Sequence, residues 1–150
     1  MSSQTNKALV QRGYALFQAG DIEHLVELFT DDIVWAAIDS EYVPYAGIYN
    51  GKDGVVEFFT KLGQSIEIER FEPLTFIAEG DQVAVEGTSA STVRSTGSHV
   101  ANRWMHVFTM RDGKICRLTQ YDDSAAIVAG FTEKQLKPEL EKERRQLPVH

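Results

Sequence analysis

The stretch that decides how this chain folds runs from residue 104 to residue 123 and reads WMHVFTMRDGKICRLTQYDD. Two runs rich in β-forming residues flank Asp112-Gly113, a dipeptide typical of the tight turn of a β-hairpin. Because side chains alternate along a strand, His106 shares one face with Trp104 and Phe108. An ionisable ring between aromatic neighbours is unusual in a plain core, so this face is the first place to look for a site.

Two turns fit the hairpin, and they place His106 opposite different residues. In a two-residue type I′ turn at Asp112-Gly113, Arg111 pairs with Lys114 and His106 lies opposite Thr119. A three-residue loop with a glycine bulge shifts the pairing by one residue, which turns the other face of the second strand toward His106.

The three-residue loop has consequences for the site. His106 then faces Leu118, and Gln120 and Asp122 lie on the same side. Leu118 to Asp122 spans four residues, roughly 13 Å of strand. In that register His106 and Asp122 flank a ligand and do not bond to each other.

Size and composition set the broad class of the protein. A chain of 150 residues with 43% apolar and 25% charged residues is typical of one soluble domain with a proper core. The net charge of −7, without a basic stripe, excludes a nucleic-acid-binding surface. The single cysteine, Cys116, excludes an internal disulfide and fits a reducing compartment. We see no signal peptide and no membrane span, so we predict a cytoplasmic protein without a membrane partner.

The first half of the chain predicts helices. Apolar residues at helical spacing favour a helix over 6–19 and a second one from Ile22 to Phe29, with Gly20 and Asp21 as caps between them. We expect Asp31-Asp32 to break the pattern and residues 33–38 to form a short strand. Asp53 is predicted to cap a third helix that reaches residue 62. The loop at 40–51 carries three tyrosines, which either line a pocket mouth or cover the edge of the core.

The second half predicts strands. Residues 66–71, 74–78 and 82–93 alternate in the manner of strands and lead into the hairpin, which makes an antiparallel meander. A short helix over 125–129 ends at Gly130, and residues 131–150 are expected to be a charged, solvated tail. We therefore predict an α+β fold with a single domain over 1–130. Three N-terminal helices pack on a strongly curved antiparallel sheet and enclose a conical pocket, as in a cystatin-like α+β barrel.

The order of these elements resembles the nuclear transport factor 2-like superfamily, and within it the SnoaL-like polyketide cyclases and ketosteroid isomerases. The resemblance covers about residues 6–130. It is carried by four motifs: Ala19-Gly20-Asp21-Ile22-Glu23, Phe29-Thr30-Asp31-Asp32, Asn50-Gly51-Lys52-Asp53-Gly54 and Arg111-Asp112-Gly113-Lys114-Ile115. These motifs are specific for the fold and say little about chemistry, because this superfold hosts enzymes, binding modules and association domains. The inward positions of the family require the three-residue loop in the hairpin, so we expect that loop.

The resemblance implies roles for individual positions. Ketosteroid isomerase uses an aspartate base, and a tyrosine and a neutral aspartic acid that stabilise the enolate. The base position falls on Ala37, the tyrosine position on Gly13 beside Tyr14, and the neutral-acid position on His106. In limonene epoxide hydrolase, a relative with an Asp-Arg-Asp set, one aspartate position corresponds to Gln120. The chain therefore departs from both catalytic patterns.

Three residues are candidates for chemistry. His106 is a donor to a developing oxyanion, since burial favours its neutral form, or else a core histidine satisfied by a neighbour. Asp122, at the end of the last strand, and Asp39, on the inward side of the first, are candidate bases; alternatively, each is a surface or capping aspartate. The candidate substrate contacts are Tyr14, Trp35, Tyr45, Phe59, Trp104, Phe108, Leu118 and Gln120.

We hypothesise a cofactor-independent SnoaL-like enzyme that abstracts a proton next to the carbonyl of a small apolar compound, in an isomerase, cyclase or lyase reaction. The alternative is a non-catalytic domain that binds or carries a small hydrophobic ligand. The histidines are dispersed, so no metal site is expected. As relatives do, the chain is expected to form a homodimer through the outer face of its sheet.

Overall fold

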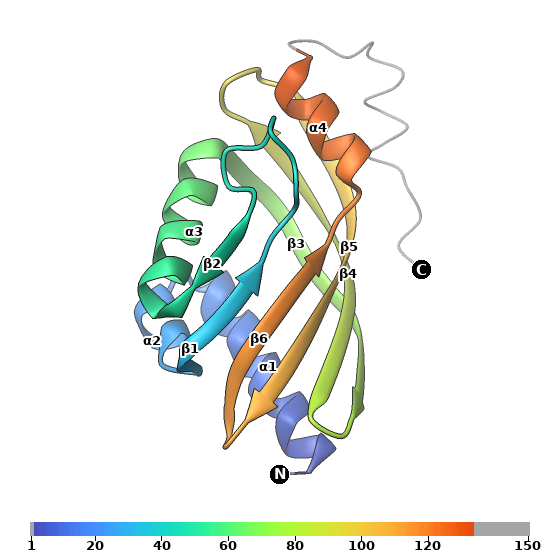
Figure 1. Ribbon diagram of the computed structural model, residues 1–150. Helices are drawn as coiled ribbons and strands as arrows, with labels where there is room; N and C mark the ends of the chain where they lie inside the picture. Colours follow the sequence, from blue (N-terminus) through green and yellow to red (C-terminus); the bar gives the residue numbers. More distant parts are fainter. Residues whose placement is uncertain (1, 134–150) are drawn as a thin grey trace.

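The structure of this chain, a computed structural model, describes residues 2–133. Helices α1 (Ser3–Gln18) and α2 (Ile22–Val26) come first, followed by strands β1 (Phe29–Ala36) and β2 (Ile48–Asn50). Helix α3 (Gly51–Ser65) leads into β3 (Ile66–Glu79), β4 (Gln82–Val93), β5 (His99–Arg111) and β6 (Lys114–Tyr121), and α4 (Ser124–Thr132) follows. The predicted α+β class with three N-terminal helices is confirmed (Figure 1).

The six strands of the described chain form one mixed sheet in the order β2-β1-β6-β5-β4-β3. Strands β3 to β6 are the predicted antiparallel meander, because each is joined to the next by a tight turn. The prediction of a wholly antiparallel sheet is wrong, since β1 pairs with β6 in parallel. These two strands are far apart in the sequence, so no hairpin turn forces them to run in opposite directions.

The hairpin between β5 and β6 differs from the expected one. Arg111 pairs with Lys114, and Asp112 and Gly113 have φ values of 53° and 79°, as a two-residue type I′ turn requires. The predicted three-residue loop is therefore wrong. Met110 pairs with Ile115 in the same register, and the register then shifts between Met110 and Thr109.

Beyond that shift, Thr109 pairs with Arg117, which leaves Cys116 as the extra residue of a β-bulge. Without the bulge, the two-residue turn would place Thr119 of β6 opposite His106; the extra residue turns the other face of β6 toward it. His106 consequently pairs with Gln120, and Leu118 pairs with Phe108 on the same side of the sheet. The residues of β6 that face inward are thus the predicted ones, but a two-residue turn followed by a bulge places them there, and not a three-residue loop.

Several element boundaries also differ from the predictions. Gly20 takes the left-handed conformation and Asp21 caps α2, as expected, but α2 ends at Val26. Asp31 and Asp32 lie within β1 because their exposed carboxylates pair with Lys52 and Arg111 at the surface.

The third helix and the third strand are both longer than predicted. Helix α3 begins at Gly51 after Asn50 and not at Asp53. Strand β3 continues through Pro73, because register shifts around Glu69 and Leu74 absorb the local irregularities.

The closing helix α4 is capped by Asp123, and it runs past the predicted end at Gly130 to Thr132. A Cβ at Gly130 would meet Val100 Cγ2 at 2.4 Å, so glycine allows close packing there and does not end the helix. Of the predicted tail, residues 131–133 continue from this helix, and the rest lies outside the described residues.

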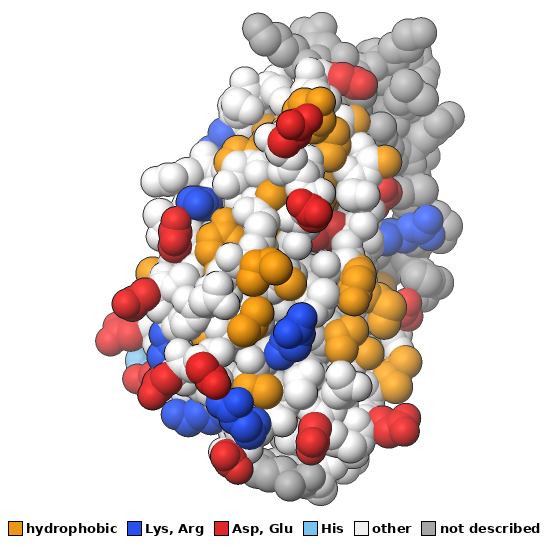
Figure 2. All heavy atoms as spheres, in the orientation of Figure 1, with side chains coloured by type: hydrophobic (Ala, Val, Ile, Leu, Met, Phe, Trp, Pro, Cys, Tyr) orange, Lys and Arg blue, Asp and Glu red, His pale blue; other side chains and the backbone are white. Residues whose placement is uncertain are grey.

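The helices position the core against one face of the sheet. Helix α1 packs on β3 and β4, α3 packs on β1 and β2, and α4 packs on β5 and β4 at the far end (Figure 1). In the same orientation, charged side chains are spread across the surface between patches of hydrophobic ones (Figure 2). No helix within residues 2–133 has the length and apolar character needed to cross a membrane.

Candidate functional site

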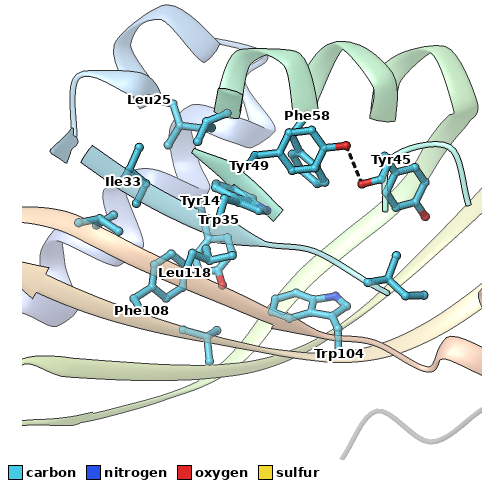
Figure 3. Close-up of a cluster of buried hydrophobic side chains, with 14 of the residues drawn as sticks. Tyr14, Leu25, Ile33, Trp35, Tyr45, Tyr49, Phe58, Trp104, Phe108 and Leu118 are labelled. Atoms are coloured by element: carbon cyan, nitrogen blue, oxygen red, sulfur yellow. Dashed lines mark hydrogen bonds between the residues drawn. The ribbon is translucent and has the colours of Figure 1, made fainter. Parts of the chain in front are cut away.

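A cavity of about 120 Å³ lies between the helices and the sheet. Apolar and aromatic side chains make up most of its wall, and they come from α1 to α4, from β1 and from β3 to β6. Figure 3 shows several of them, including Tyr14, Trp35, Trp104 and Leu118, around one space. The polar groups in the wall are few: Tyr14, Tyr45, Ser89, Ser91, Asn102, His106, Gln120 and Asp122.

The structure brings nearly all of the predicted site residues together. His106, Asp122 and every predicted substrate contact line this cavity: Tyr14, Trp35, Tyr45, Phe59, Trp104, Phe108, Leu118 and Gln120. Asp39 does not; it is exposed at the surface, so we do not assign it to the site. Of the three loop tyrosines, Tyr45 reaches the cavity and Tyr42 is 55% exposed.

The third loop tyrosine covers the core edge. Tyr49 is buried and packs against Phe58. Its hydroxyl donates to the carbonyl oxygen of Tyr45 at 3.0 Å (Figure 3). This bond holds the backbone of the loop at the position from which the Tyr45 side chain reaches the cavity.

A buried hydrogen bond joins α1 to β5 in the middle of the cavity wall. The hydroxyl of Tyr14 lies 2.7 Å from Nδ1 of His106, which is 6% exposed. Burial lowers the pKa of His106 to about 3 and raises the pKa of Tyr14 well above its usual value. Both side chains are therefore neutral near pH 7.

The neutral Tyr14–His106 pair holds two protons and uses only one of them internally. If Tyr14 donates to Nδ1, the ring proton is on Nε2, which faces the NH₂ group of Gln120 at 3.5 Å and finds no acceptor there. If Nδ1–H donates to Tyr14, the Gln120 amide donates to Nε2 and the tyrosine proton is not used within the pair. Either tautomer leaves one donor of the pair for a further partner.

Aromatic rings support this pair from the side. Trp104 stacks on His106 with ring centroids 4.1 Å apart, and Phe71 stacks on Trp104 at 4.9 Å. Gly87 makes room for this stack, since a Cβ there would lie 2.3 Å from Cζ2 of Trp104. The indole N–H groups of Trp35 and Trp104 are buried and find no acceptor among the described residues. Two unused donors in a cavity wall call for an explanation.

Asp122 marks a second polar region of the cavity. Burial raises the pKa of its carboxyl, against the lowering effect of a 2.8 Å hydrogen bond from Asn102. The charge of Asp122 also contributes, after burial, to the raised pKa of Tyr45. The Asp122 carboxyl and the Tyr45 hydroxyl are thus neighbours in the cavity wall.

The separation of His106 and Asp122 is shorter than predicted. His106 pairs with Gln120, so Asp122 lies two residues further along, roughly 7 Å of strand. The expected separation of roughly 13 Å was wrong because the two-residue turn and the bulge at Cys116 each shift β6 by one residue relative to β5. The two groups remain too far apart to bond, and they are close enough to contact one small molecule.

Asn102 is the main polar residue that sequence reasoning missed. It lies on β5 with the same parity as Trp104 and His106, so extending the alternation backward would have found it. Ser89 and Ser91 of β4 belong to the same inward face. Phe131 also lines the cavity, but it could not be predicted from strand alternation because it lies in the residues assigned to the C-terminal tail. Within residues 2–133, no group of three His, Cys, Asp or Glu side chains is arranged to hold a metal ion.

The sequence profile of the SnoaL-like domain family matches residues 10–118. This chain belongs to the SnoaL-like domain family. The matched residues include Tyr14, Trp104 and His106. They also include Asn102, but not its hydrogen-bond partner Asp122. The family resemblance stated from the sequence motifs is confirmed.

Relatives of this SnoaL-like chain include an RNA polymerase sigma factor and several solved structures. The ECF RNA polymerase sigma factor SigG of Mycobacterium tuberculosis is 28% identical over 116 residues, which are 77% of this chain but only 28% of that protein. An NTF2-like protein from Burkholderia xenovorans is 28% identical, with 88% of this chain and 99% of that chain covered and a TM-score of 0.81. TerC, crystallised with polyporic acid, is 27% identical, with 85% and 98% covered and a TM-score of 0.76. The predicted NTF2-like fold is thereby confirmed.

Proposed function

We propose that this SnoaL-like chain is a cofactor-independent enzyme that removes a proton next to the carbonyl group of a small apolar compound. The carbanion then leads to isomerisation, aldol-type cyclisation or elimination. The compound binds in the cavity, which we take to be a conical pocket enclosed by a curved sheet. One observation carries the proposal: the neutral Tyr14–His106 pair and the Asp122 carboxyl line the same largely apolar cavity.

The Tyr14–His106 pair acts on the carbonyl oxygen. When the proton leaves the carbon, its electron pair moves toward that oxygen, which becomes negative. The donor that the pair does not use internally, Nε2–H or the tyrosine O–H, stabilises this charge. Burial strengthens such a hydrogen bond because little water screens it.

Asp122 acts as the base. Burial disfavours its charge and raises its pKa, so its carboxylate takes a proton more readily than an exposed aspartate does. The proton moves from the substrate carbon to a carboxylate oxygen, and in an isomerisation Asp122 returns it to another carbon. A separation of roughly 7 Å along the strand leaves space for one ring between base and donor.

The aromatic wall favours a ring compound with hydrogen-bond acceptors. The stack of Phe71, Trp104 and His106 offers a flat contact surface. A ligand oxygen near the indole N–H of Trp104 would supply the acceptor that the protein lacks. The crystallisation of TerC with polyporic acid supports a ligand-binding role for this type of cavity.

Proton abstraction can be measured before the natural substrate is known. We expect the wild-type chain to exchange the α-protons of some cyclic ketones for deuterium in heavy water, followed by ¹H NMR. Asp122→Asn is expected to slow this exchange at least about 100-fold, because it removes the base. The matched control is Asp39→Asn, which removes an exposed carboxylate outside the cavity and should leave the rate unchanged.

Exchange at the wild-type rate in Asp122→Asn would contradict the assignment of the base. Absence of exchange with every ketone that binds would favour the alternative function, a non-catalytic binding domain for a small hydrophobic ligand. Two observations favour that alternative. The relative SigG is an RNA polymerase sigma factor, 28% of which matches this chain, and neither His106 nor Tyr14 titrates near neutral pH. Mass spectrometry of a ligand that co-purifies with the chain would identify it.

We also propose that two copies pair through the outer face of the sheet, the face turned away from α1 and α3. This face exposes Ile77 of β3, Met105 of β5 and Tyr121 of β6, with exposed fractions of 60%, 38% and 59%. Apolar side chains on neighbouring strands are suited to a symmetric contact with a second copy.

A further inference from the structure

We infer that Asn102 is a positioning residue, which fixes the direction of the Asp122 carboxyl and stabilises its charged form. The inference rests on the proposed function, because it takes Asp122 as the base. Asn102 touches neither the Tyr14–His106 pair nor, by this inference, the reacting atoms. It acts through the hydrogen bond that it donates to Asp122.

Hydrogen bonds hold the Asn102 amide at both of its ends. Its Nδ2 donates to Oδ1 of Asp122 at 2.8 Å, and its Oδ1 accepts the backbone N–H of Asp123 at 2.8 Å. A backbone N–H can only donate, so the end of the amide that faces Asp123 must be the oxygen. The NH₂ group must therefore face Asp122, and the amide cannot be reversed without losing both bonds.

The two carboxylate oxygens of Asp122 therefore have different surroundings. Oδ1 of Asp122 is occupied by Asn102, while no hydrogen bond from a described residue is made to Oδ2. Oδ2 is thus the oxygen whose lone pairs are available for a substrate proton. Holding one oxygen also restricts rotation of the carboxyl, so the base does not have to be oriented anew in each reaction cycle.

The charge balance of Asp122 explains why a donor is needed there. The carboxyl is partly buried, and the neighbouring Asp123 adds a like charge; both effects raise its pKa. Tyr45, which faces it from the 40–47 loop, is neutral. The Asn102 amide is the group that lowers the pKa, so it keeps the buried carboxyl ionised at a lower pH than burial alone would allow.

Asn102 also has a structural connection, which the test must separate from positioning. Asp123 caps α4 by accepting the backbone N–H of Ala126 at 3.2 Å, and α4 carries Ile127 of the cavity wall. A purely structural Asn102 would hold the start of α4 against β5. Its loss would lower stability without moving the titration of Asp122.

The experiment measures the titration directly on the full chain. The Asp122 side-chain carbon is followed by ¹³C NMR against pH, and it is assigned by its absence from Asp122→Asn. In Asn102→Ala we expect the proton affinity of Asp122 to rise about tenfold, because a donor to a buried charge is lost. The acid limb of the pH–rate profile for exchange should therefore move about one pH unit higher, so activity falls most at low pH.

Asn102→Asp is the second variant, which keeps an acceptor for the Asp123 N–H and the cap of α4 but replaces the donor with a carboxyl. It should raise the proton affinity of Asp122 at least as much as Asn102→Ala while losing less stability. Arg103→Ala, exposed on the opposite face of β5, is the control and should leave both the titration and the rate unchanged.

Two failures can be told apart. If both Asn102 variants leave the titration of Asp122 and the acid limb in place while Asp122→Asn stops exchange, Asn102 is structural and the proposed function stands. If Asp122→Asn retains the wild-type rate, the proposed base is wrong, and with it the positioning role of Asn102.

Discussion

Among single residues, His106 offers the clearest link between burial and a measurable property. Its pKa falls from 6.5 to about 3 because the folded protein withholds water from the charged ring. Between these two values the unfolded chain binds a proton that the folded chain does not, so stability falls as the pH falls from about 6.5 toward 3. We expect His106 to remove about 1.4 kcal/mol of stability per pH unit within this window.

The measurement is urea unfolding of the wild type and of His106→Gln at pH values from 7 to 4.5. Glutamine keeps a polar group near Tyr14 and does not titrate, so groups such as Asp122 contribute equally to both proteins and cancel. The wild-type curve should fall away from that of His106→Gln below about pH 6.5. Parallel curves would show that folding does not lower the pKa of His106.

At the scale of elements, the bulge at Cys116 decides which face of β6 lines the cavity. Inserting one alanine after Cys116, with the type I′ turn and the bulge kept, would slide the rest of the strand by one residue and turn Arg117 and Thr119 toward the core in place of Leu118 and Gln120. We expect this insertion to cost more than about 4 kcal/mol, since it buries a charge without a partner. Chemical unfolding, or the yield of soluble protein, measures the loss.

The matched control for the insertion is Cys116→Ser, which retains the residue count and a donor to the carbonyl oxygen of Thr109, the bond that Cys116 makes at 3.4 Å. It should change stability by less than about 1 kcal/mol. An insertion that is tolerated as well as the serine variant would show that a wider bulge absorbs the added residue and that the strand does not slide.

The same hairpin shows which features of the fold could be predicted from the sequence. Local chemistry identified the Gly20-Asp21 corner, the meander and the Asp112-Gly113 turn, because each depends on residues next to one another. The bulge has no such signal, since Cys116 is an ordinary strand residue and does not have the positive φ that favours glycine. The parallel pairing of β1 with β6 joins distant segments, so no periodicity predicts it. The inward parity of β5 nevertheless placed Trp104, His106 and Phe108 in one cavity wall.

At the scale of the whole molecule, the sheet separates two surfaces with different roles. Its inner face carries the cavity, and its outer face carries the apolar side chains of Ile77, Met105 and Tyr121. The polar groups of the site all lie on the inner side or at the end of β6. Pairing of two copies through the outer face would therefore leave the cavity intact, and assembly and ligand binding can be tested separately.

We expect the wild type to have twice the mass of one chain by size-exclusion chromatography with light scattering, and to dissociate on dilution. Met105→Glu should shift this equilibrium toward the monomer, because it places like charges near each other across a two-fold contact. Tyr42→Glu, which adds the same charge to an exposed loop residue away from this face, should leave the dimer intact. Because Met105 points away from the cavity, monomeric Met105→Glu should still bind the ligand. A wild-type monomer at high concentration would refute the proposed dimer, and loss of ligand binding in the monomeric variant would show that the two faces are coupled.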